Sequence, residues 1–213
     1  MGCEILLEKV NKKYGSQTVL CDVCAHFEPG KIYGIIGRNG SGKTVLLKCI
    51  AGFIQDYSGR ITIDGTDRKR IPIDSLLIGA IIETPGFVRG YSGFQNLKFL
   101  ANVRHRIPND AIRAAMESVG LDPKSRKHVN KYSMGMRQRL GIAQALMENP
   151  PLFLLDEPMN GLDNQGVREI RELFKQLRAQ GNTLLMASHN PLDIEELCDK
   201  VYEMDQGHLA PIG

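Results

Sequence analysis

The sequence lacks tryptophan, contains no long apolar run and carries little net charge. Without tryptophan, ligand binding cannot be followed through indole fluorescence and requires a labelled ligand. No apolar run approaches the roughly 18 residues of a membrane-spanning helix, which argues against an integral membrane protein. The formal charge of +3 is too small to indicate a nucleic acid partner, and we expect none.

Cysteines and targeting signals are also sparse. The N-terminal segment has no basic stretch followed by a long apolar core, so we expect no secretory signal. The five cysteines are odd in number and widely scattered, which fits reduced thiols better than a disulfide framework. Cys21 and Cys24 form a C-x-x-C pair, but a zinc site needs a second pair or histidines at matched spacing, and neither is present. We therefore expect structural cysteines and a cytoplasmic protein.

Apolar residues recur along the chain with two different periods. Short alternating or continuous apolar segments between turn residues predict strands, and apolar residues spaced three and four positions apart predict helices. The predicted strands lie at 3–15, 17–30, 31–37, 57–65, 75–83, 151–157 and 182–189, with a closing hairpin over 201–209. The predicted helices lie at 44–52, 93–105, 109–121, 137–146, 164–181 and 191–198, the third capped by Asn109.

The order of these elements indicates an α/β fold. The length of the chain suits one domain over residues 1–213 with a sizeable core. We expect a parallel-sheet core, an antiparallel β subdomain contributed mainly by the N-terminal strands, and a helical subdomain inserted at about 87–147.

Residues 37–44 read GRNGSGKT, which matches the pattern G-x-x-x-x-G-K-[ST] in full. A strand precedes this segment and a helix follows it, a context that a chance glycine-rich turn would lack. The glycines let the backbone wrap around phosphates, Lys43 reaches the β- and γ-phosphates, and Thr44 offers its hydroxyl to Mg²⁺. We predict a P-loop NTPase core whose nucleotide site contains Gly37, Arg38, Asn39, Gly40, Ser41, Gly42, Lys43 and Thr44.

The segment LFLLDE, residues 152–157, runs from four apolar residues into two carboxylates. A buried strand that ends at Asp156 can direct this carboxylate to the Mg²⁺ ion. Glu157 comes one residue later and points elsewhere, within reach of a water that attacks the γ-phosphate. Taken alone, the two acidic residues could simply end a strand. Together with the phosphate loop, they predict hydrolysis rather than binding alone.

A second helix start also suits an anion. Ser133 and Gly135 stand just before the helix of YSMGMRQRLGIAQAL, residues 132–146, which we expect to begin near Met136. The first N–H groups of a helix are unpaired, and the helix dipole is positive there. The chain thus has two candidate phosphate sites about ninety residues apart.

The motifs GRNGSGKT, YSMGMRQR, LFLLDEP, NGLD and ASH, in this order, resemble the ATP-binding cassette of ABC transporters across essentially the whole chain. The resemblance implies that Tyr14 stacks on adenine, that Asp163 communicates across a dimer, and that His189 contacts the γ-phosphate. Without it, the same residues could be a core tyrosine, a helix cap and a loop histidine. Asp163 can serve both as a cap and in the dimer.

The resemblance also accounts for the second phosphate site. Ser133 and Gly135 match the signature motif, which binds the γ-phosphate of the ATP held by the other subunit. Two identical chains would then enclose two ATP molecules through a two-fold contact. The usual motif is Leu-Ser-Gly-Gly-Gln, and here Met134 and Met136 replace its first glycine and its glutamine.

A second departure concerns Glu83, in IIETPGF, where the family usually has the glutamine that touches Mg²⁺ and links the helical lobe to the membrane partner. A carboxylate adds a negative charge beside the metal. The resemblance therefore assigns Thr44, Glu83 and Asp156 to the metal. Glu83 followed by Pro-Gly-Phe, together with the Ser-x-Gly-Met signature, is similar to ATPases of exporters of bacitracin-like or lantibiotic peptides.

These features predict an ATPase that dimerises around two ATP with Mg²⁺ and powers a separate membrane permease. We expect it to drive export of a peptide antibiotic or similar compound from the inner face of the cell membrane, with Glu157, His189 and Lys43 catalytic. One alternative is a soluble ABC ATPase acting on nucleic acid or ribosomes, but such proteins carry tandem cassettes or long inserts before the signature. Another is a nucleotide sensor without turnover, which would not need Glu157.

Overall fold

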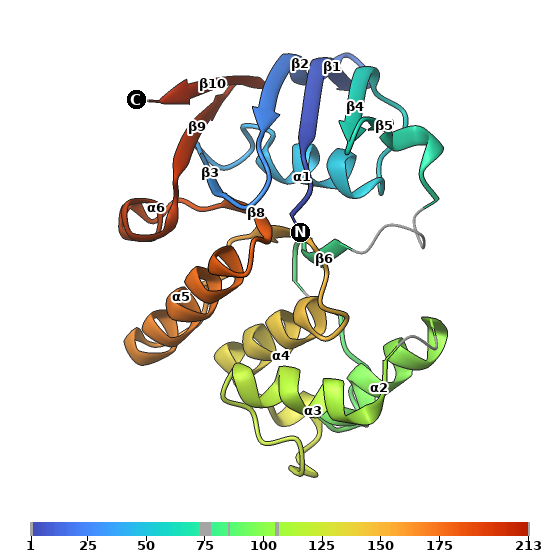
Figure 1. Ribbon diagram of the computed structural model, residues 1–213, viewed down its shortest axis with the longest axis vertical. Helices are drawn as coiled ribbons and strands as arrows, with labels where there is room; N and C mark the ends of the chain where they lie inside the picture. The colour runs from blue at the N-terminus through green and yellow to red at the C-terminus, as the bar shows by residue number, and fades with distance from the viewer. Residues whose placement is uncertain (1, 73–77, 85, 105–106, 213) are drawn as a thin grey trace.

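The computed structural model describes residues 2–72, 78–84, 86–104 and 107–212, which form two sheets and six α-helices (Figure 1). The first sheet is antiparallel, in the order β2-β1-β4-β5. Its strands are β1 (Ile5–Tyr14), β2 (Gln17–Phe27), β4 (Ser58–Ile63) and β5 (Thr66–Asp67). Along β1, buried residues such as Ile5, Leu7 and Val10 are separated by exposed ones, as expected for a sheet with one face on the core.

The second sheet has the order β10-β9-β3-β8-β7-β6, and all its neighbouring pairs except β10 with β9 are parallel. Its strands are β3 (Ile32–Ile36), β6 (Ile78–Ile81), β7 (Leu152–Asp156), β8 (Thr183–Ala187), β9 (Lys200–Asp205) and β10 (His208–Ile212). Every residue of β8 is buried, and β3 and β7 are buried except at their last residues. The ends of β3 and β7 are therefore the parts of these strands that are accessible to a ligand.

The helices cover both faces of the second sheet. They are α1 (Lys43–Ala51), α2 (Gly93–Arg104), α3 (Asn109–Ser118), α4 (Met134–Leu146), α5 (Asn164–Ala179) and α6 (Pro191–Leu197), with short 3₁₀ turns η1 (Arg68–Arg70) and η2 (Val129–Lys131). In Figure 1, α1 lies beside the first sheet, and α2, α3 and α4 gather at the opposite end of the molecule. In the part of the chain that the structure describes, no helix has the length and apolar character needed to cross a membrane.

The core consists of two clusters on the two faces of the second sheet. Tyr33 and Ile35 of β3 pack with α1 and the first sheet, whereas Ile32 packs in the cluster that includes residues of α4 and α5. This alternation follows from the two-residue period of a strand. The phosphate-loop helix α1 is therefore clamped between the two sheets.

Arg68 closes the other end of α1 and is only 1% exposed. Its guanidinium donates to the carbonyl oxygens of Ile50 (3.0 Å), Ala51 (2.5 Å) and Ile71 (2.7 Å). The last carbonyls of a helix have no partner within the helix, and a cation there also complements the helix dipole. Arg68 thus fixes the helix that carries the phosphate loop.

The α/β class and its parallel and antiparallel parts are confirmed, whereas the predicted cap of α3 and the predicted start of α4 are wrong. Asn109 is the first residue of α3, and Pro108 holds the cap position in an extended conformation. Helix α4 begins at Met134 rather than near Met136, because Ser133 accepts from the Met136 N–H and caps it. Of the predicted strand 75–83, residues 78–81 form β6, and 75–77 lie outside the described residues. The three helices α2, α3 and α4 fall within 87–147, whose limits as a subdomain stay a prediction.

Candidate nucleotide site

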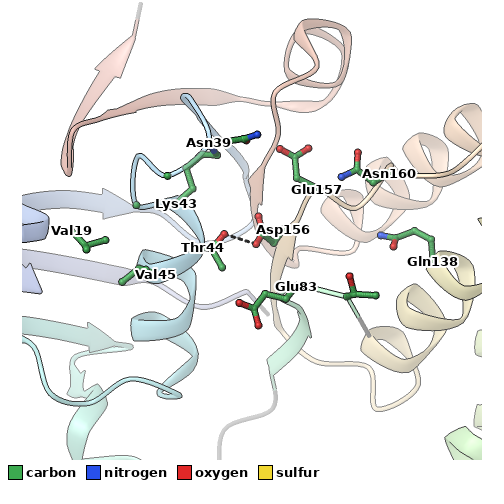
Figure 2. A pocket seen from close by; sticks show the side chains of 13 residues that line it. Val19, Asn39, Lys43, Thr44, Val45, Glu83, Gln138, Asp156, Glu157 and Asn160 are labelled. Atoms are coloured by element: carbon green, nitrogen blue, oxygen red, sulfur yellow. Dashed lines mark hydrogen bonds between the residues drawn. The ribbon is translucent and has the colours of Figure 1, made fainter. Parts of the chain in front are cut away.

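A cavity of about 550 Å³ opens where β3 and β7 end (Figure 2). It collects residues from the phosphate loop, from α1, from the segment after β6, from α4 and from the segment after β7. The lining residues are Val19, Asn39, Gly40, Gly42, Lys43, Thr44, Val45, Glu83, Thr84, Gln138, Asp156, Glu157 and Asn160.

Glycines shape the loop between β3 and α1. Gly40 and Gly42 have φ values of 80° and 118°, in the region that favours glycine. A Cβ on Gly42 would also come within 2.7 Å of the Val19 carbonyl oxygen. Gly42 is the cap residue of α1 and has no side chain to occupy the first N–H groups. These groups are therefore available to phosphate oxygens.

Lys43 lies inside this loop and is 7% exposed. Its Nζ donates to the carbonyl oxygens of Gly37 (2.7 Å) and Arg38 (3.0 Å). The nearby Ser41 hydroxyl is buried and has no hydrogen-bond partner within the described part of the chain. Buried polar groups are usually paired, so the loop has donors to offer to a ligand that brings oxygen atoms.

Thr44 and Asp156 meet across the cavity. The Thr44 Oγ1 donates to Asp156 Oδ2 at 2.7 Å, which joins the start of α1 to the end of β7 (Figure 2). A hydroxyl and a carboxylate oxygen are ligands that suit Mg²⁺, which usually takes few protein ligands and completes its shell with phosphate oxygens and water. The donor set of this structure therefore fits a magnesium ion.

Glu157 also lines the cavity and has an unusual backbone. Its φ is 49°, and its N–H donates to the Ala187 carbonyl oxygen of β8 at 2.9 Å. Its Oε1 lies 2.8 Å from His189 Nδ1. A left-handed conformation costs energy for a residue with a side chain, and such conformations occur preferentially at functional sites. The backbone at Glu157 turns its carboxylate away from the direction of Asp156, as Figure 2 shows.

Glu83 has a partner that the sequence did not reveal. Its Oε1 accepts from Lys48 Nζ at 2.6 Å, which places the carboxylate against α1. The Glu83 side chain is 64% exposed, and its φ is 64°. The pair joins the segment after β6 to the phosphate-loop helix. Lys48 balances the negative charge of Glu83, a charge that the family's usual glutamine would not carry.

Ser133, Gly135 and Asp163 line a separate cavity of about 430 Å³. The starts of α4 and α5 meet there: Ser133 caps α4, and Asp163 Oδ1 accepts from the Gly166 N–H at 2.8 Å and caps α5. A Cβ on Gly135 would approach the Gly161 carbonyl oxygen to 2.8 Å, so the glycine permits this packing. Among the described residues, none lines both this cavity and the one at the phosphate loop.

Other predicted residues lie around these cavities. Tyr14 ends β1 and is half exposed, with Lys12 Nζ 4.4 Å from its ring centre; within the described chain, Val19 rather than Tyr14 lines the phosphate-loop cavity. A third cavity of about 840 Å³ is lined by Gly37, Arg38 and His189 together with residues of α6 and β9. The His189–Glu157 contact connects it to the first cavity. The roles of all these residues stay predictions.

Five lining residues had no prediction: Val19, Val45, Thr84, Gln138 and Asn160. Val45 and Thr84 are chain neighbours of predicted residues, which is the only signal the sequence offers for them. Gln138 reaches the site from α4 and donates to the Pro158 carbonyl oxygen at 2.9 Å. This contact depends on the packing of two segments that are distant in the chain.

The cysteines do not contribute reactive groups to this site. All five are free thiols. Burial raises the pKa of Cys49 and of Cys198 to about 12, so both stay protonated at neutral pH. Thiolates are the reactive form of cysteine.

Comparisons with known proteins agree on one family. The model of the ABC transporter family matches residues 20–160. The chain is 42% identical over 206 residues to the bacitracin transport ATP-binding protein BcrA of Enterococcus faecalis, covering 95% of this chain and 67% of that protein. It is 34% identical over 203 residues to the lantibiotic transport ATP-binding protein SrtF of Streptococcus pyogenes, covering 95% and 87%.

Solved structures share the fold. A dimeric ATP-binding cassette in a post-hydrolysis state, bound to ADP and Pi, superposes with a TM-score of 0.88 at 22% identity and covers 98% of this chain and 99% of its own. A nucleotide-free cassette from an ABC transporter gives a TM-score of 0.85 at 24% identity, with coverage of 98% and 90%.

Proposed function

Because the chain belongs to the ABC transporter family, we propose that it is the ATP-hydrolysing subunit of an exporter, which powers a separate membrane permease. One observation carries this proposal: Thr44 and Asp156 meet at 2.7 Å in the cavity that also holds the phosphate loop and Glu157. Binding, metal and hydrolytic groups thus converge on one space.

ATP binds with its phosphates in the loop of residues 37–44. The N–H groups at the start of α1 and of the loop glycines donate to the phosphate oxygens, and these oxygens replace the Gly37 and Arg38 carbonyls as acceptors for Lys43. Tyr14 stacks on the adenine after a small movement from Lys12.

Thr44 and Asp156 would hold Mg²⁺, and Glu83 would be available to the ion on leaving Lys48. When bound, the ion neutralises charge that develops on the phosphates. Glu157 accepts a proton from the attacking water, and His189 orients the Glu157 carboxylate through Nδ1 and reaches the γ-phosphate. Lys43 stabilises the negative charge on the transferred group.

Two chains complete each other's sites. Ser133 Oγ accepts from the Met136 N–H at 3.2 Å, which leaves the hydroxyl proton free to donate to a phosphate. In the dimer, Ser133 and Gly135 of one chain bind the ATP held by the other chain. Asp163 lies at the contact between the two chains and communicates between their two ATP sites. The separation of the two cavities within one chain supports this arrangement.

The substrate is a peptide antibiotic such as bacitracin or a lantibiotic, and the chain works at the inner face of the cell membrane on its permease. The transport names of the relatives support this step. To test it, the tagged chain is purified from detergent-solubilised membranes of its own cells. We expect a polytopic membrane protein to co-purify and bacitracin or a lantibiotic to stimulate ATP hydrolysis by the complex. Recovery with ribosomes or nucleic acid instead would contradict the proposal.

Replacement of Glu83 by glutamine should leave the affinity for ATP within about fivefold, because the exposed ion pair with Lys48 contributes only about 0–1 kcal/mol. We expect the stimulation of ATP hydrolysis by the permease to change instead, since the substitution alters the charge beside the metal and frees Lys48. Binding is measured with labelled ATP, and activity with and without the permease. Lys48→Gln is the matched control, because it breaks the pair and keeps the carboxylate. Identical stimulation in Glu83→Gln and the parent protein would make the carboxylate incidental.

A further inference from the structure

Arg171 of α5 is a buried cation outside the cavities described above. Its side chain is 8% exposed, and its Nε and one terminal nitrogen donate to Asp193 Oδ1 at 2.9 and 2.6 Å. Its other terminal nitrogen donates to Glu196 Oε1 at 2.7 Å. Asp193 is itself 2% exposed and lies in the first turn of α6. The guanidinium therefore binds α5 to α6 with two carboxylates.

The second oxygen of Asp193 contacts the loop that carries His189. Asp193 Oδ2 accepts from Ser188 Oγ at 3.4 Å, and the same hydroxyl accepts from the Asn190 N–H at 3.1 Å. The Ser188 N–H donates to the Ile35 carbonyl oxygen of β3 at 3.3 Å. Both neighbours of His189 are thus held, while the imidazole itself is 64% exposed and touches Glu157.

Helix α5 also begins at the second cavity. Its cap Asp163 lies two turns before Arg171 and lines the cavity that contains Ser133. Helix α5, the Arg171–Asp193 pair and the Ser188 hydrogen bond thus form a connected set of contacts between the start of α5 and the loop that carries His189.

Stability alone is a weak reason for a buried ion pair. The desolvation of two charges offsets most of their attraction, and a well-packed apolar pair is often as stable. The contact with Ser188 also connects the ion pair to the loop that carries His189. These features distinguish the cluster from the pair of Arg178, also on α5, with Asp199, whose side chains lie 2.9 Å apart but are 40% and 31% exposed.

We propose that Arg171, Asp193 and Ser188 are positioning residues that hold His189 against Glu157. The inference rests on the proposed ATPase function and adds residues that act on hydrolysis through His189. Arg171, Asp193 and Ser188 are not among the described residues that line the phosphate-loop cavity. Their effect is expected in the rate of hydrolysis and not in ATP affinity.

Three variants test this: Ser188→Ala, which keeps the ion pair, Asp193→Asn, which keeps the shape, and Arg171→Lys, which keeps the charge. Each is made alone and with His189→Ala, and Arg178→Met is the matched control. We expect kcat to fall by roughly 10- to 100-fold with labelled ATP binding unchanged within about twofold. In the His189→Ala background, the same changes should cause no further loss, because they act through this side chain.

Thermal unfolding accompanies each assay, so that loss of folded protein is separated from loss of rate. The inference would be overturned if each substitution lowered kcat further in the His189→Ala background, or if its kcat equalled that of Arg178→Met. Hydrolysis of ATP by the parent chain would still support the proposed ATPase function in that case. Absence of hydrolysis by the parent chain with its permease would instead overturn the ATPase and this inference with it.

Discussion

Glutamine in place of Glu157 is expected to lower the turnover of ATP by on the order of 10²–10⁴ and to leave ATP binding intact. Glutamine preserves the shape and the contact with His189 but cannot accept a proton from water. Glu157 lines the phosphate-loop cavity, and its side chain is 22% exposed, so a water can reach it. Lys43, Thr44 and Asp156, which we assign to the phosphates and Mg²⁺, are untouched by the change.

This variant should also accumulate as a dimer. ATP then stays between the two chains, and gel filtration in the presence of ATP should show a dimer that the parent protein forms only transiently. Glu172→Gln is the matched control, since Glu172 is an exposed carboxylate on α5 that pairs with Lys175. Bound nucleotide is followed with a labelled analogue, because the chain has no tryptophan. Turnover close to that of Glu172→Gln would remove Glu157 as the general base.

The sequence predicted the parts of the site that are local. The segment 37–44 follows β3 directly and ends in the first turn of α1, so the pattern of glycines, Lys43 and Thr44 predicts the loop by itself. Asp156 ends a continuous apolar segment, and this composition predicted a strand buried on both faces. The Thr44–Asp156 contact then follows from parallel strands that end at the same edge of the sheet.

Contacts between distant segments were not predictable from patterns. Lys48 and Glu83 are 35 residues apart, and Arg171 and Asp193 are 22 residues apart. Each contact depends on how two elements pack, which no local period encodes. The start of α4 was missed because methionine and glycine gave no apolar period, although the Ser133 cap extends the helix to Met134.

The largest effect is expected in a mixture of two inactive variants. Lys43→Ala removes the cation that we assign to the phosphates, and Ser133→Arg places a bulky side chain where we expect the start of α4 to meet a phosphate. Each homodimer has two damaged sites and should be inactive. A mixed dimer has one site that combines both lesions and one that combines the intact loop of the Ser133→Arg chain with the intact Ser133 of its partner.

Random mixing makes about half of the dimers hybrid, each with one intact site of two. Independent sites would then restore roughly a quarter of the parent activity, and coupled sites less, because neighbouring sites need not be additive. If Ser133 instead served the ATP of its own chain, neither chain in the mixture would contain both intact motifs. The two arrangements thus give opposite results in one assay.

The decisive measurement is the ATPase rate of this mixture in the presence of the permease, with hybrid formation verified by pull-down through two different tags. The account predicts a rate well above the sum of the two inactive homodimers and up to roughly a quarter of that of the parent protein. A rate equal to that sum, with hybrids present, would contradict the claim that Ser133 acts on the ATP of the other chain.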